Sequence, residues 1–390
     1  YEAMVLMSAA FERQDSLSFA RAELAKAFDV SNKDARVANQ YARFLLRQSD
    51  IPRAEEVLVD SLSVNARDVE NLRLLASVRL AQQDWRGAEE VGVMLENAGD
   101  ESSLASNIKS AAYIGLEDYN SVIETLSARG ADAPLDAQPL GALVSAYIRE
   151  ERLAEAEDML TRMLEADPDN YNAQLQVARV YAAQSDAGKF EDALIRATET
   201  DADRPEAYEL LYRTYLVDNR REQAAALIER GLRASPDNEA LKVYKADVLL
   251  SQGDRAGALA IYSELIETRP NDRIIANNFV SLSSDLRLDE QSIVRALEIA
   301  KRIEDVDNAF YRDTVGWAYY RAGEYGKALE YLTQAVEQTG DNAEMLYHLG
   351  AAQMATGDED AARQTLQNAL AAGGEDFTFA DEVQALLDRM

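Results

Sequence analysis

Cysteine is absent from this 390-residue chain, which excludes disulfide bonds, thiolate metal ligands and cysteine nucleophiles. A single histidine, His348, excludes a metal site built from several histidines and leaves any histidine-dependent triad to rest on one residue. We interpret His348 as a side chain on a helix surface. No phosphate-binding loop of the GxxxxGK[ST] or GxGxxG type occurs. The sequence therefore predicts a non-enzymatic protein with no catalytic residues, no metal site and no cofactor.

Helix-breaking residues and long apolar runs are also scarce. The chain has 7 Pro and 18 Gly, and it is rich in residues that favour helix, so we expect helix throughout. No apolar run approaches the roughly 20 residues that a transmembrane helix needs. The net charge of −30 argues against nucleic acid as a partner, because phosphate binding depends on clustered Lys and Arg.

The residues that are present repeat with a period of 34. A column of small residues recurs at this step, with a miss at Phe190 and a shift of two residues near the end: Ala20, Ala54, Ala88, Val122, Ala156, Ala224, Ala258, Ala328 and Ala362. Such a period indicates one helical hairpin copied about eleven times, with neighbouring copies stacking into a continuous core. The units begin near residues 1, 35, 69, 103, 137, 171, 205, 239, 273, 309 and 343.

Other positions repeat in the same register. The eighth residue of a unit is mostly small and the twenty-fourth mostly leucine, so we expect the leucine to fill the space between closely approaching helices. Three units end in proline followed by Asp or Asn, which stops one helix and can cap the next: Pro168, Pro236 and Pro270.

These features resemble the tetratricopeptide repeat (TPR) family. The best copy, residues 309–342, has the residues that the family favours at Gly316, Tyr319, Gly323, Tyr325, Ala328 and Leu332. The resemblance implies an all-α fold, an α-solenoid coiled as a right-handed superhelix. We expect the repeat array to span residues 1–376 and a C-terminal capping helix to span residues 377–390.

Three places depart from a regular array. Phe190 in unit 171–204 and Ser292 in the longer unit 273–308 replace the small residue, so we expect distorted hairpins and a bend there. In the closing segment, Phe377, Phe379, Val383, Leu386 and Leu387 share one helical face that would cover the last hairpin. Nothing comparable covers the first unit, so we expect a further element or a longer chain on that side.

A narrower resemblance concerns residues 313–320, Asp-Thr-Val-Gly-Trp-Ala-Tyr-Tyr, and Tyr347-His348-Leu349-Gly350. These segments are similar to the C-terminal repeats of bacterial envelope TPR proteins of the exopolysaccharide and PEP-CTERM type. The likeness implies a periplasmic or outer-membrane-associated scaffold, with a signal or lipid anchor upstream of residue 1 and with polysaccharide-export machinery among its partners.

The resemblance also predicts where a partner binds. Family geometry places positions 2, 5, 9, 12 and 13 of each unit on the concave face, where this chain has nine basic and nine acidic residues. The predicted groove is therefore neutral although the chain is strongly acidic. Polar and basic candidates for binding an extended peptide or protein through fixed donor geometry are Arg36, Asn39, Arg43, Arg47, Arg73, Asn107, Arg179 and Arg213. The alternative is that these arginines lie in water or pair with Glu on the next helix.

The other end of the predicted groove is aromatic. Phe310, Trp317, Tyr320 and Tyr347 fall on the same face, with Asp313 and Arg321 beside them. Clustered aromatic residues can anchor a peptide or stack on sugar rings. The alternative is that the C-terminal helix folds over them and buries them. We interpret Trp85 as an inter-helix packing residue.

Three functions remain open at this point. The first is a protein-binding scaffold in a bacterial envelope that supports exopolysaccharide export or assembly. The second is an envelope module that binds carbohydrate through its aromatic end. The third is a cytoplasmic regulatory or assembly protein.

Overall fold

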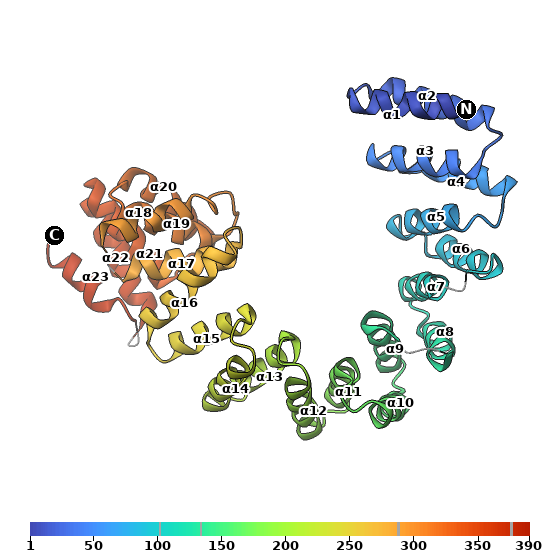
Figure 1. The fold of residues 1–390 in the computed structure, drawn as a ribbon. Coiled ribbons are helices and arrows are strands. Elements are labelled where there is room, and N and C mark those ends of the chain that lie inside the picture. The colour runs from blue at the N-terminus through green and yellow to red at the C-terminus, as the bar shows by residue number, and fades with distance from the viewer. Residues whose placement is uncertain (101–102, 133–134, 287–288, 375–376) are drawn as a thin grey trace. The chain divides into compact units, whose positions relative to one another are not determined.

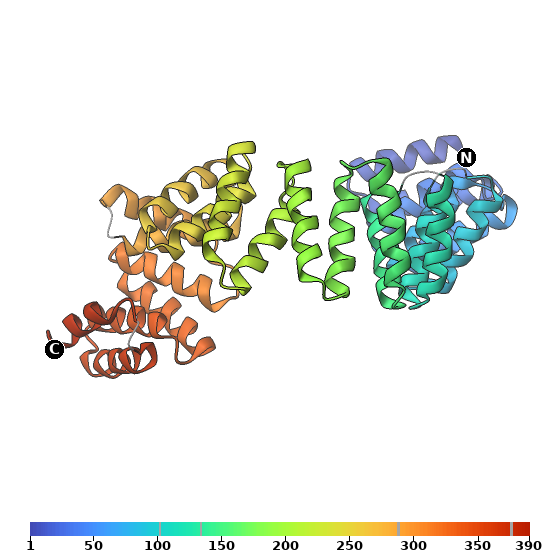
Figure 2. The same cartoon turned by 90° about the horizontal axis from the view of Figure 1, so that it is seen from below.

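The computed structural model of the chain describes residues 1–100, 103–132, 135–286, 289–374 and 377–390. Within these ranges it contains 23 α-helices and no β-strand, which confirms the predicted all-α helical-repeat fold (Figure 1). The chain forms two compact parts, each made of several repeats: Tyr1–Asp201, called the first unit below, and Ala202–Met390, called the second unit. In each unit, helices that follow one another in sequence pack as antiparallel pairs, as Figure 2 shows from a second direction.

The first unit contains six hairpins. Their helices are α1 (Glu2–Arg13), α2 (Leu17–Val30), α3 (Ala35–Arg47), α4 (Ile51–Val64), α5 (Val69–Ala81), α6 (Trp85–Asn97), α7 (Leu104–Gly115), α8 (Tyr119–Asp132), α9 (Ala137–Arg149), α10 (Leu153–Ala166), α11 (Tyr171–Ala183) and α12 (Ala187–Thr200).

The second unit contains five hairpins and a last short helix. Its helices are α13 (Pro205–Val217), α14 (Arg221–Ala234), α15 (Glu239–Ser251), α16 (Arg255–Thr268), α17 (Arg273–Asp285), α18 (Glu290–Ala300), α19 (Ala309–Arg321), α20 (Tyr325–Thr339), α21 (Ala343–Thr356), α22 (Glu359–Gly373) and α23 (Ala380–Leu387). The predicted end of the repeat array, residue 376, lies outside the described residues.

The start of each hairpin follows from local capping chemistry. Nine of the eleven first helices begin at the predicted start of their unit, and α1 and α7 begin one residue later. Where proline ends a unit, the capping residue is one position farther on than we expected. Asn170, Asn238 and Asp272 accept hydrogen bonds from the first turns of α11, α15 and α17.

The column of small residues lies where the two helices of a hairpin touch, and we call this contact the seam. All nine members, from Ala20 to Ala362, are at most 1% exposed. The eighth and twenty-fourth positions meet as predicted: a Cβ added to Gly316 would lie 2.7 Å from Cγ of Leu332, and one added to Gly350 would lie 2.7 Å from Cγ of Leu366. At these two positions the helices approach so closely that a residue with a Cβ atom would collide with the leucine of the partner helix.

The turn inside each hairpin imposes a second repeated constraint, which the sequence analysis missed. The fifteenth residue of ten units has a positive φ, as in Glu151 at 57° and Asn219 at 58°. Glycine, which adopts this conformation without a steric penalty, occupies the position only in the later units, at Gly253, Gly323 and Gly357. The turn therefore repeats even where its residue type does not.

The two units with an unusual small-residue column differ from each other. In unit 273–308, α18 has 11 residues, whereas the other second helices have 13 to 15, so the hairpin is distorted as expected. In unit 171–204, α11 and α12 have the ordinary lengths of 13 and 14 residues, and Phe190 is half-buried. The expected distortion at Phe190 is therefore wrong as far as helix length is concerned.

None of the helices in the described part of the chain combines the length and apolar character needed to cross a membrane.

The helix seam can be tested by adding one methyl group at two glycines of the same hairpin. Gly316→Ala should lower the free energy of unfolding by about 1–3 kcal/mol, because the new Cβ would also lie 3.1 Å from the backbone nitrogen of Leu332. Gly326→Ala, in the first turn of α20, meets no heavy atom within 4 Å and should raise it by about 0.5–1 kcal/mol. Urea unfolding followed by circular dichroism measures both. Equal midpoints for the two variants would contradict this account of the seam.

Candidate partner-binding site

Three consecutive first helices of the second unit, α17, α19 and α21, pack side by side. Trp317 and Tyr320 project from α19, and Tyr347 projects from α21. The ring of Trp317 stacks on Tyr320 at 4.5 Å between centroids and on His348 at 4.1 Å, and it lies 5.5 Å from Tyr347. The predicted aromatic group therefore forms one stacked cluster.

The C-terminal helix α23 closes over this cluster. Phe379, at its start, stacks on Tyr347 at 5.2 Å, and Val383 is fully buried. Phe377 lies against the backbone of Gly373, where an added Cβ would approach the ring to 2.4 Å. As a result Trp317 is only 5% exposed and Tyr347 is buried, as in the alternative that has the C-terminal helix cover them.

Between α19, α21 and α23 lies a pocket of about 520 Å³. Its walls combine aromatic, aliphatic and charged side chains of both signs: Trp317, Tyr320, Arg321, Tyr347, Asp381, Glu382, Ala385, Leu386 and Arg389. Four of the six residues predicted at the aromatic end thus line one cavity. Phe310 does not line it and is 59% exposed, and Asp313 is buried elsewhere.

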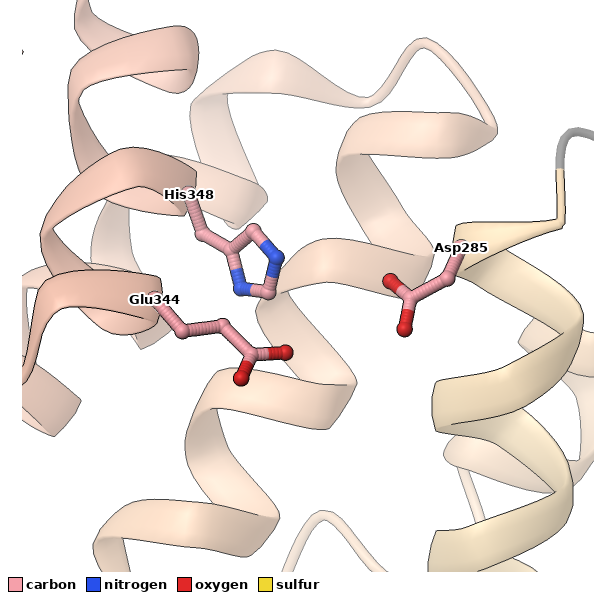
Figure 3. Close-up of side chains that lie close together, drawn as sticks. All are labelled: Asp285, Glu344 and His348. Atoms are coloured by element: carbon pink, nitrogen blue, oxygen red, sulfur yellow. The ribbon is translucent and has the colours of Figure 1, made fainter. Parts of the chain in front are cut away.

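His348 is not the helix-surface side chain that we expected. It is 2% exposed, and its Nδ1 lies 3.0 Å from both carboxylate oxygens of Asp313. Stacking on Trp317 and pairing with Asp313 turn the imidazole inward. The side chain of Asp285, on α17, points toward His348 (Figure 3). Its carboxylate accepts a hydrogen bond from Nε1 of Trp317 at 3.0 Å and pairs with Arg255.

Burial and charge act in opposite directions on these groups. Burial lowers the pKa of His348, but the negative charges of Asp313, Glu344 and Asp285 outweigh it, and the pKa lies above its ordinary value. Burial raises the pKa of the Asp285 carboxyl, although the charges of His348 and Arg255 oppose the shift.

The predicted basic face of the first unit is occupied by internal contacts. Nε of Arg43 donates to Oδ1 of Asn39 at 2.7 Å, and Nδ2 of Asn39 donates to Oδ1 of buried Asn71 at 3.1 Å. Arg47 pairs with Glu12 at 2.7 Å, and Arg73 pairs with Asp100 at 3.3 Å.

Four further polar candidates, Asn107, Arg179, Arg213 and Arg321, also have partners within the chain. Asn107 accepts a hydrogen bond from Arg129 at 2.7 Å, and Arg179 donates to Gln176 at 2.7 Å and Ser145 at 2.9 Å. In the second unit, Arg213 pairs with Glu209 at 2.8 Å, and Arg321 donates to the carbonyl oxygen of Ser284. Arg36 is exposed on α3. For most of these arginines the structure matches the alternative of pairing within the chain.

Sequence reasoning missed two residues that organise these surfaces. Asn71 is fully buried, and its Nδ2 donates to the carbonyl oxygen of Ala35 and to Ser61. An asparagine at a position that is otherwise apolar would have been a signal for it. His348 was named but placed on the surface, since the helical period alone does not reveal that α23 covers this side. Trp85 was placed correctly: its ring lies against Gly115, where an added Cβ would approach it to 2.2 Å.

Comparison with protein families finds one that matches. The family described as tetratricopeptide repeat matches residues 147–213, 216–277 and 319–388, just over half of the chain.

Several solved structures also share similarity with the chain. The structure of Naa15/Naa10 bound to HypK-THB is 16% identical, with a TM-score of 0.38, over 98% of this chain and 65% of that one. The chain thus spans slightly less than two thirds of that protein. A chain in the crystal structure of the APC/C hetero-tetramer Cut9-Hcn1 is 11% identical, with a TM-score of 0.43, over 99% of this chain and 95% of that one. A thermophilic TPR protein of Thermus thermophilus, TTC0263, is 22% identical, with a TM-score of 0.36, over 47% and 99%. No curated protein sequence matches the chain.

The closure by α23 can be measured through Trp317. In a Trp85→Phe background, Trp317 is the sole tryptophan, and its burial should give a blue emission maximum and weak quenching by acrylamide. Val383→Asp puts a charge at a fully buried position of α23, so it should release the helix, shift the emission to the red and increase quenching. Gln384→Glu adds the same charge at the exposed neighbouring position and should change neither signal. Equal quenching of the two variants would show that α23 does not cover Trp317.

Proposed function

Because the chain belongs to the tetratricopeptide repeat family, whose members bind protein partners, we propose that it is a non-enzymatic scaffold that binds an extended segment of a protein partner. The observation that carries the proposal is the pocket between α19, α21 and α23, in which aromatic side chains meet charged residues of both signs.

The pocket has the chemistry of a peptide anchor site. Trp317 and Tyr347 form an apolar interior, and Leu386 and Ala385 extend it along α23. Buried aromatic residues surrounded by polar ones are typical of the energetic centre of protein interfaces. A volume of about 520 Å³ accommodates a large apolar or aromatic side chain and part of the backbone on either side of it.

Charged side chains at the pocket would fix the direction of the bound segment. Arg321 and Arg389 supply positive charge, and Asp381 and Glu382 supply negative charge. A partner segment with an apolar anchor flanked by one acidic and one basic residue would complement this arrangement. The pocket therefore favours a segment of mixed charge over a uniformly acidic one.

The basic face of the first unit is a second surface in this proposal, and we rank it below the pocket. Arg43, Arg47 and Arg73 already have partners within the chain, so a ligand would have to displace those contacts. Exchanging one charge-assisted hydrogen bond for another yields little net affinity.

A carbohydrate-binding function receives less support. Stacking on a sugar ring requires an exposed aromatic face, whereas Trp317 is 5% exposed and Tyr347 is also buried. We therefore assign the aromatic cluster to binding a peptide side chain.

The scaffold acts, in our proposal, in a bacterial cell envelope and supports the export or assembly of exopolysaccharide. Support for a location in the cell envelope comes from the segments 313–320 and 347–350, which resemble the C-terminal repeats of envelope proteins of that type.

Filling the pocket should abolish partner binding. Ala385 is exposed on α23 and lines the pocket, so Ala385→Arg would occupy it without removing a buried contact. Peptides selected from a random library on the wild-type chain, with counter-selection on Ala385→Arg, should bind the wild type at least about ten-fold more tightly, a difference of about 1.4 kcal/mol, by fluorescence polarisation. Gln384→Arg adds the same charge one residue away from the pocket lining and should bind like the wild type.

The same assay distinguishes the two surfaces. If the selected peptides bind Ala385→Arg as tightly as wild type but lose affinity for the double variant Arg43→Glu, Arg73→Glu, the site lies in the first unit and our placement is wrong. Recovery of the same binders by all variants would refute both surfaces.

The envelope location predicts a protein that is released or accessible outside the inner membrane. In spheroplasts of the native organism, the protein should be cleaved by added protease or be found in the periplasmic or outer-membrane fraction. Full protection, together with recovery in the cytoplasmic fraction, would contradict the location and leave the binding proposal intact.

A further inference from the structure

One polar group beside the pocket is not explained by peptide binding. Asp285 at the end of α17 and Glu344 and His348 on α21 each bring a potential ligand atom within 4.8 Å of the others. Figure 3 shows that the three side chains converge from two elements on one small region. We propose that these residues bind a single divalent cation of the Zn²⁺ type.

The imidazole is oriented as in a metal-binding histidine. Nδ1 of His348 lies 3.0 Å from both oxygens of Asp313, and because a carboxylate can only accept, this nitrogen carries the proton. The lone pair of the neutral ring is then on Nε2, which faces Asp285 in Figure 3. A carboxylate that holds the far nitrogen of a histidine is the usual support of a histidine ligand to zinc.

Nε2 of His348 is buried and has no hydrogen-bond partner among the described residues. A buried polar atom without a partner costs about 1–3 kcal/mol. A charged histidine would not remove the problem, because Nε2 would then be a donor that no acceptor in the described part of the chain reaches. A cation bound to the Nε2 lone pair would satisfy the atom.

The surrounding charge also calls for a cation. Three carboxylates lie around the imidazole: Asp285, Asp313 and Glu344. Arg255 pairs with Asp285 and offsets one of their three negative charges. A cation on Nε2 requires the neutral imidazole, and with that form of the ring the three carboxylates and Arg255 carry two more negative than positive charges, which one divalent ion balances. The side chain of Asp285 is only 4% exposed, so water screens this excess weakly.

Two of the three ligands are held in place before any cation binds. Asp285 is fixed by Nε1 of Trp317 and by Arg255, and His348 is fixed by Asp313 and by stacking on Trp317. Glu344 is exposed, so it can complete the site from the solvent side. One imidazole nitrogen with two carboxylates suits Zn²⁺, Mn²⁺ or Co²⁺ better than Ca²⁺ or Mg²⁺, which prefer oxygen ligands alone.

The experiment uses the full chain without a histidine tag, so that His348 is the only imidazole. In the Trp85→Phe background, Co²⁺ should quench Trp317 in a saturable manner at one ion per chain, because Trp317 stacks on His348 at 4.1 Å. Excess Zn²⁺, which does not quench, should displace Co²⁺ and restore the emission. Isothermal titration with ZnCl₂ should give the same stoichiometry.

Variants then identify the ligands. Glu344→Gln should weaken binding by about ten-fold or more, and His348→Gln should abolish it. Glu337→Gln removes one exposed carboxylate from α20 and should bind like the wild type. Because His348 is buried, circular dichroism checks its variant; if that variant unfolds, the exposed Glu344 decides the outcome.

The proposal is overturned if Co²⁺ does not quench Trp317 in a saturable manner, or if Zn²⁺ fails to reverse the quenching. It is also overturned if Glu344→Gln binds Co²⁺ as tightly as Glu337→Gln does.

Discussion

The close approach of the two helices in a hairpin is the contact on which the rest of the structure depends, and nine of the eleven hairpins place a small column residue there. A residue of the small column faces the partner helix with at most 1% of its surface exposed, and Gly316 and Gly350 leave just enough space for a leucine at the twenty-fourth position. A hairpin this thin exposes an apolar face on each side, which its neighbour covers. Stacking of neighbouring hairpins therefore buries the apolar faces that a single hairpin leaves exposed.

Stacking also decides which residues meet. Contacts join residues about one repeat apart on adjacent first helices, as in Asn39 with Asn71, Asp285 with Trp317, and Asp313 with His348. Each of these contacts joins two neighbouring first helices, so residues of two adjacent repeats together form the surface. Asp285 on α17, for example, contacts Trp317 on α19, which in turn lines the pocket beside α21.

The period of 34 predicted the fold because it reports directly on the seam, and the starts of the hairpins followed to within one residue. The candidate site was harder to predict. Position numbers placed Trp317, Tyr320, Arg321 and Tyr347 on one face, and these four line the pocket. The period says nothing about α23, which belongs to no repeat, so it could not tell that Trp317 is covered. It also could not place His348, whose direction depends on Asp313 in the preceding repeat.

The charged residues between regular repeats differ from those near the C-terminal helix. In the first unit, Arg47 and Arg73 are matched by Glu12 and Asp100 from neighbouring repeats, and such pairs near water need no further compensation. At the end of the second unit, the side chain of Asp285 is 4% exposed and Asp313 is buried, so an excess of negative charge is costly there. The excess persists because the same two carboxylates hold Trp317 and His348 in position. The stacking of α17, α19 and α21 thus brings partly buried carboxylates close together, and positive charge beside them lowers the cost of their burial.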